Sequence, residues 1–141
     1  MRRSRSFLLA LLLFASTIFA DVLDVPEVTQ EKTQWCWAGS SAAILLFYGE
    51  VMTQPEIVQW AFGDSTINQW NYSWGNNSVP YPEGHPKYGE NIPNSKAIDK
   101  ILLNWRTTPK NMAKALTEAE FRSEIDGQHP FVIRWGWSAG G

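Results

Sequence analysis

The chain has 141 residues, with 12 Lys and Arg against 14 Asp and Glu, one Cys and eight Trp. A single Cys cannot form an intramolecular disulfide, so the chain is not a disulfide-stapled scaffold. Its formal net charge of −2, without a basic block, argues against a nucleic-acid partner. Length and composition indicate one globular domain.

The first twenty residues have the order of a secretory signal peptide. Three Arg residues precede the apolar run 7–14, and small, polar and apolar residues lead to Ala20. The apolar stretch is shorter than the roughly 20 residues that cross a bilayer, which argues against a membrane anchor. We predict a signal peptide at 1–20, with cleavage after Ala15 or Thr17 as open alternatives. The mature domain, 21–141, is then secreted or periplasmic and free of the membrane.

The next segments predict an extended stretch followed by a buried helix. Residues 21–32 contain Pro26, which disfavours a helix there. Residues 36–48 read CWAGSSAAILLFY, with apolar residues at helical spacing, and Gly49 is suited to end the helix. Because this helix is apolar nearly all round, we expect it to be buried.

Two Thr-x-x-Glu capping boxes mark further helix starts. Thr53 begins a short helix that ends at Gly63, and Thr117 begins another that ends at Gly127. Between them, residues 64–93 have no apolar period and predict a long loop, a feature that is usually functional or mobile. A third helix is expected to start at Asn94 and to run through the apolar residues up to 102.

Residues 130–137, PFVIRWGW, have the composition of a β-strand. A single strand cannot form a sheet, so it needs partners. We expect either that residues 21–28 and 105–108 supply them, or that the chain is a fragment that ends before the remaining strands.

Cys36 is the residue with the clearest chemical potential. It stands at the predicted start of a buried helix, where the unpaired N–H groups and the helix dipole favour an anion such as a thiolate. A thiolate is a nucleophile, and the side-chain amide of Gln30 could donate to an oxyanion formed beside it. Trp35 and Trp37 flank the thiol and could shield it from water or contact a substrate. The alternative is that Cys36 is a small hydrophobic residue of the core.

Residues 30–38, QEKTQWCWA, resemble the nucleophile segment of papain-like cysteine peptidases. The resemblance is closest to the secreted bacterial branch related to staphopains, to effector proteases of plant pathogens and to bacteriocin-leader peptidases. In these families a Gln lies six positions before the Cys that opens the central helix, as Gln30 precedes Cys36. The Phe47-Tyr48-Gly49 helix end and the segment 130–137 are similar too.

The resemblance implies an α+β fold, in which the Cys-bearing helix packs on an antiparallel sheet or half-barrel. It implies an exported cysteine-type peptidase that cleaves a peptide or protein substrate, with Cys36 as nucleophile and Gln30 as oxyanion donor. The base in such proteins is a His that follows the strand, which places it just beyond residue 141, so the present chain is expected to be inactive by itself. We expect a monomer that needs no cofactor or metal.

The two His residues of the chain have more ordinary interpretations. His85 lies in the long loop, and His129 precedes Pro130 in a turn. Neither stands after an apolar strand, as the base does in the similar families. One Cys and two distant His match no metal-ligand spacing.

The aromatic loop gives a second hypothesis, a non-catalytic exported relic of a papain-like protein that binds a peptide or glycan. Five aromatic residues and four Asn lie between positions 68 and 88, and Trp74 is a candidate substrate contact. Aromatic side chains in polar loops mark recognition surfaces. The alternative, which we favour, is that these rings pack the loop onto the core with their polar tips outward.

Overall fold

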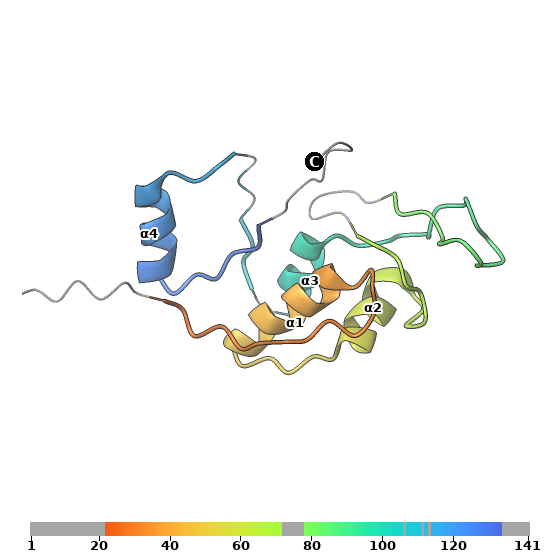
Figure 1. Ribbon diagram of the computed structural model, residues 1–141, viewed down its shortest axis with the longest axis horizontal. Coiled ribbons are helices and arrows are strands. Elements are labelled where there is room, and N and C mark those ends of the chain that lie inside the picture. Colours follow the sequence, from red (N-terminus) through yellow and green to blue (C-terminus); the bar gives the residue numbers. More distant parts are fainter. Residues whose placement is uncertain (1–21, 72–77, 106, 111, 113, 134–141) are drawn as a thin grey trace, which may run out of the picture.

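The computed structural model describes residues 22–71, 78–105, 107–110, 112 and 114–133 (Figure 1). In this part, the chain forms helices α1 (Cys36–Phe47), α2 (Gln54–Phe62), α3 (Ile98–Asn104) and α4 (Glu118–Asp126). The predicted signal peptide, residues 1–20, lies outside the described residues. None of the described helices is long and apolar enough to span a bilayer.

Helix α1 forms the centre of the core, as the sequence predicted. Most of its residues are buried, and both α2 and α3 pack against it and against each other. The N-terminal segment runs alongside α1 in the opposite direction before turning back into it (Figure 1). The helix ends in a Schellman motif, in which Gly49 has a φ of +83° and Glu50 N–H donates to the Leu45 carbonyl at 2.9 Å.

Both predicted capping boxes are confirmed. The Thr53 hydroxyl accepts from the Glu56 N–H, and the Glu56 carboxylate accepts from the Thr53 N–H at 2.8 Å. Thr117 and Glu120 form the same reciprocal pair at the start of α4. Each pair satisfies N–H groups that a helix start otherwise leaves without a partner.

The predicted start of α3 is wrong by several residues. Asn94 has a left-handed φ of +55° in a turn, and the Lys96 N–H donates to the Ala61 carbonyl at 3.1 Å. These residues tie the loop to α2, so the helix begins only at Ile98, with Ala97 at its N-cap and no side-chain cap. The turn-forming preference of Asn explains why it stands outside the helix.

The predicted α+β fold with an antiparallel sheet is contradicted. Within the described residues there is no β-strand, and the isolated bridge between Pro80 and Asn91 is the β-pairing that they contain. The expected strand fails over 130–133, and the described parts of its proposed partners, 21–28 and 105–108, form no strand either. Residues 134–137 lie outside the described part.

A different kind of packing replaces the expected strand. The Phe131 ring meets the Phe121 ring of α4 edge to face at 4.8 Å, and Val132 packs against the core of the three-helix unit. These contacts bury part of the Phe131 and Val132 side chains without a neighbouring strand, whereas Ile133 stays exposed. The apolar composition of the segment therefore corresponds to partial side-chain packing and not to hydrogen-bonded strand pairing.

Helix α4 stands apart from the other three helices (Figure 1). It contacts none of them, and none of its residues is buried. Its stability therefore depends on its capping box and on local contacts such as Phe121 with Phe131.

The capping box of α4 predicts a pH dependence. The hydrogen bond from Lys114, followed by those from the Thr117 backbone and hydroxyl, lowers the pKa of Glu120 to about 2. Because the pKa is lower in the folded state, this contribution to stability is complete above the ordinary value of 4.5 and is lost as the pH falls towards 2. We expect Lys114→Gln to raise the pKa of Glu120, as measured by NMR titration of its carboxyl carbon.

Lys100→Gln is the matched control, since Lys100 is exposed on α3 and pairs with Asp99. It should leave the titration of Glu120 unchanged. An identical Glu120 titration curve in Lys114→Gln and the unmodified chain would show that Lys114 does not stabilise this carboxylate.

Candidate functional site

Cys36 is the first residue of α1, and its side chain is exposed. The residues on either side of it, Trp35 and Trp37, are buried, as is Ala38 in the same turn. No side chain caps this end of the helix, and its first turn contains no acidic residue. The thiol therefore lies where first-turn N–H groups point outward and where no carboxylate of the turn opposes a negative charge.

The two Trp residues beside Cys36 are turned into the protein. Trp35 is 1% exposed and its indole N–H donates to the Ile67 carbonyl at 2.8 Å. Trp37 is 3% exposed and donates to the Gln69 carbonyl at 3.0 Å. Both rings thus fix the start of the long loop against α1, and this packing accounts for their presence. Their predicted contact with a substrate stays a prediction.

The segment before Cys36 is fastened to the same loop. Lys32 Nζ donates to the Thr66 carbonyl at 3.2 Å and lies 4.2 Å from the centre of the Trp35 ring. The Gln34 N–H donates to Asn68 Oδ1 at 3.1 Å, and the Asn68 amide in turn donates to the Thr33 hydroxyl. Residues 32–34, which precede the thiol, are therefore held by contacts with Thr66 and Asn68, more than thirty positions away in the sequence.

Gln30 lies beside the first turn of α1, as the peptidase hypothesis requires. A Cβ at Gly39 would lie 3.8 Å from the Gln30 Cα, so the two backbones are in close approach. The Gln30 side chain is exposed and its amide donates to the Lys32 carbonyl. Within the described residues, no hydrogen bond joins Gln30 to Cys36.

Gln54 holds the Gln30 backbone in place. This side chain, 2% exposed at the start of α2, donates from Nε2 to the Thr29 carbonyl at 2.7 Å. Its Oε1 accepts from the Glu31 N–H at 3.1 Å. One amide therefore satisfies the backbone on both sides of Gln30. Gln54 was not predicted from the sequence, because a Gln at the first position of a capped helix ordinarily faces solvent.

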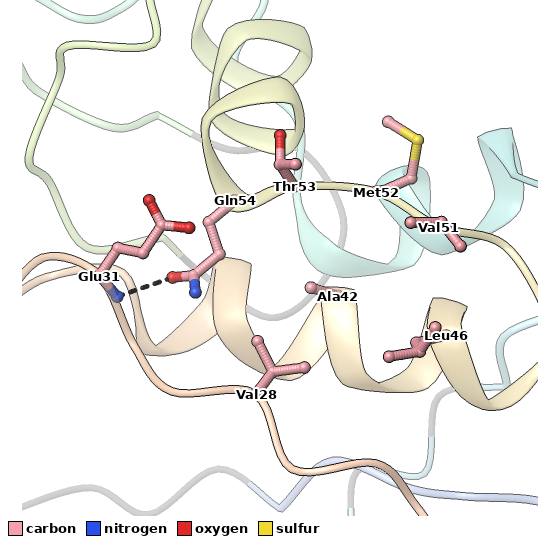
Figure 2. A pocket seen from close by; sticks show the side chains of 8 residues that line it. All are labelled: Val28, Glu31, Ala42, Leu46, Val51, Met52, Thr53 and Gln54. Atoms are coloured by element: carbon pink, nitrogen blue, oxygen red, sulfur yellow. Dashed lines mark hydrogen bonds between the residues drawn. The ribbon is translucent and has the colours of Figure 1, made fainter.

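The two hydrogen bonds of the Gln54 side chain, to Thr29 and to Glu31, are called the amide clamp below. A cavity of about 120 Å³ adjoins this clamp (Figure 2). Gln54 and Glu31 lie at one end of it, and Leu46 and Val51 lie at the other, with Val28 below. The hydrogen bonds of Gln54 therefore hold the N-terminal segment at one end of this cavity, and Val28 packs against the core along it.

Neither His residue hydrogen-bonds Cys36 in the described structure. His85 Nδ1 accepts from the Lys87 N–H at 3.1 Å, and its ring stacks on Tyr81 at 4.2 Å. His129 Nδ1 lies 3.1 Å from Glu124 Oε2. Both rings therefore have local partners, in agreement with their more ordinary interpretations.

One acidic residue near the loop has a shifted pKa. Hydrogen bonds from the Thr66 hydroxyl and then from its N–H lower the pKa of Asp64, and the positive charge of Lys32 adds to this effect.

The aromatic loop is described only in part. Asn71 Nδ2 donates to the Lys96 carbonyl at 2.9 Å, and Tyr81 is partly buried against the core, which supports the packing interpretation for these residues. Trp70 and Tyr88 are exposed. Trp74 lies outside the described residues. The described residues contain no group of three or more His, Cys, Asp and Glu placed to hold a metal ion.

No family model matches the chain, and no curated protein or solved structure is similar to it. The papain-like resemblance of residues 30–38 therefore stays a hypothesis.

The amide clamp predicts a specific loss of stability. Gln54→Leu keeps the size of the side chain but leaves the Thr29 carbonyl and the Glu31 N–H without this partner, which costs about 1–3 kcal/mol of unfolding free energy. Urea denaturation measures the loss.

Gln59→Leu is the matched control on the same helix. Gln59 also bonds two backbone groups, at Gly63 and Ser65, but it is exposed, so water can replace it. Its loss should be roughly 0.5 kcal/mol or less. Equal losses for the two variants would contradict a structural role for the buried amide.

Proposed function

We propose that the chain is an exported cysteine peptidase, in which Cys36 is the nucleophile and Gln30 donates to the oxyanion. The observation that carries this proposal is the exposure of one thiol at the open end of an otherwise buried helix. A structural Cys in a core is ordinarily buried and inert, whereas a reactive one is accessible and near a positive field. The signal-like residues 1–20 support export, and a peptide or protein is the proposed substrate.

The chemistry begins with attack of the Cys36 Sγ on a peptide carbonyl. A bond forms between sulfur and the carbonyl carbon, and the carbonyl oxygen becomes an oxyanion. An amide N–H placed beside that oxygen stabilises it more than it stabilises the planar substrate. The thiol proton passes to a general base, which gives it to the departing amine as the C–N bond breaks and a thioester forms on Cys36. Water then hydrolyses the thioester, which releases the carboxylic acid and restores the thiol.

Gln30 is suited to the donor role because its backbone is fixed and its side chain is free to turn. The amide clamp of Gln54 holds Thr29 and Glu31, so the Cα of Gln30 stays beside the first turn of α1. The Gln30 amide must leave the Lys32 carbonyl to reach an oxyanion. That exchange replaces one exposed hydrogen bond with one to a charged oxygen, which is the stronger kind.

The packing of the two indoles contributes by holding the thiol in place. Trp35 and Trp37 anchor the residues before and after Cys36, so the thiol cannot withdraw into the core without breaking two buried hydrogen bonds. A fixed nucleophile needs less reorganisation in the attack.

Acylation by an activated ester tests the nucleophile and the oxyanion donor together. A p-nitrophenyl ester of an acylated amino acid should transfer its acyl group to Cys36, releasing p-nitrophenolate, without needing a general acid for the leaving group. We expect Gln30→Leu to slow this step by on the order of 10²-fold, the usual loss for one oxyanion donor. Release of p-nitrophenolate and the intact mass of the chain measure the reaction.

Gln34→Leu is the matched control, because it removes another exposed Gln near the thiol whose structural bond is made by its backbone N–H. It should leave the rate unchanged, and Cys36→Ser should abolish acylation while keeping the melting temperature. Equal rates for Gln30→Leu, Gln34→Leu and the unmodified chain would remove Gln30 from the mechanism. Failure of Cys36 to be acylated would contradict the proposal as a whole.

A further inference from the structure

A large cavity separates the three-helix core from the C-terminal part of the described chain. Its volume is about 890 Å³, in the upper part of the roughly 300–1,000 Å³ range of small-molecule sites. Apolar side chains from several elements line it, namely Ile44 of α1, Ile98 and Leu102 of α3, Phe121 of α4, Phe131 and Val132. Neither Cys36 nor Gln30, Trp35 or Trp37 lines this cavity, so it is separate from the thiol site.

The cavity is open because the segments that form its walls contact each other through few residues. Helix α4 packs against none of the other helices, so the segment 107–133 meets the core mainly through residues such as Val132. Tyr48, Phe121 and Ile133 line the space and remain substantially exposed. Apolar walls without atoms opposite them lose their dispersion contacts, so an apolar molecule is favoured there over water.

One polar group in the lining lacks a partner. The Thr107 Oγ1 is buried and, among the described residues, has no hydrogen bond. Its backbone is fixed, since the Thr107 N–H donates to the Leu102 carbonyl at 3.2 Å. A buried hydroxyl without a partner is unfavourable, so the cavity is suited to a molecule that brings one polar group to Thr107.

The charges around the cavity favour an anionic group on that molecule. Of the charged residues that line it, Lys114 pairs with Glu120, and Glu124 pairs with His129. Lys110 also lines the cavity and forms no ion pair within the described part of the chain. Lys110 and Thr107 both line the cavity and belong to one short segment, so a cation and a hydroxyl border the same space.

We propose that this cavity binds a single-chain aliphatic carboxylate, a molecule of the fatty-acid class. The alkyl chain contacts the apolar walls from α1, α3 and α4, and the carboxylate interacts with Lys110 and accepts from the Thr107 hydroxyl. Such a ligand joins the α4 segment to the three-helix core and so stabilises the folded chain.

Binding of laurate to the full chain, below the micelle concentration, tests the proposal. Isothermal titration calorimetry should detect one molecule of laurate per chain, with a rise in melting temperature. Lys110→Gln should weaken laurate about tenfold but leave the neutral analogue dodecanol unaffected, since only the acid carries a charge. Thr107→Val, which keeps the shape of the side chain, should weaken both ligands. Lys100→Gln, an exposed lysine on α3 outside the cavity, is the control and should weaken neither.

The other outcomes would overturn the assignment. Absence of laurate binding, or equal effects of Lys110→Gln and Lys100→Gln, would exclude the carboxylate site. A concentration-dependent dimer that does not bind laurate would assign the cavity to a second copy of the chain. Laurate binding only after removal of residues 134–141 would assign it to that segment.

Discussion

The structure depends on the burial of one helix that is apolar around its whole circumference. An amphipathic helix needs a single covering surface, but α1 needs cover on every side. Helices α2 and α3 supply part of it and irregular segments supply more, while Cys36 and Leu46 stay exposed (Figure 1). Irregular segments lack the regular backbone hydrogen bonds of a helix or a sheet, so their buried N–H and C=O groups require side-chain partners. The amide of Gln54 and the indoles of Trp35 and Trp37 supply those partners.

This constraint also defines the candidate site. Because the covering segments hold both flanks of the start of α1, the helix end is fixed while Cys36 itself stays exposed. The same contacts bring the Gln30 backbone next to Gly39, which has no side chain to keep it away. The residues that carry the thiol and the proposed oxyanion donor are thus held by polar contacts of the covering segments.

Local sequence patterns were sufficient to predict the helices that begin with a capping box or end at a glycine. The Thr-Glu pairs at 53–56 and 117–120 and the glycine at 49 each act through neighbours on the chain, so α1, α2 and α4 were predictable. The contacts around Cys36 were not, because residues more than twenty positions apart supply them. The strand predicted at 130–133 was wrong, since pairing into a sheet requires a partner that no local pattern reveals; Phe131 instead contacts Phe121, and Ile133 stays exposed.

The most direct test of whether the fold activates Cys36 is its rate of reaction with a peptide thioester. The rate is measured in the folded chain and in the same chain unfolded in urea. Unfolding removes the helix end, the two anchored indoles and the approach of Gln30, but it keeps the thiol and its neighbours in sequence. The account predicts that the folded chain is acylated at least about tenfold faster, since helix N–H groups and a nearby amide both favour the attack. Equal or slower acylation of the folded chain would contradict it.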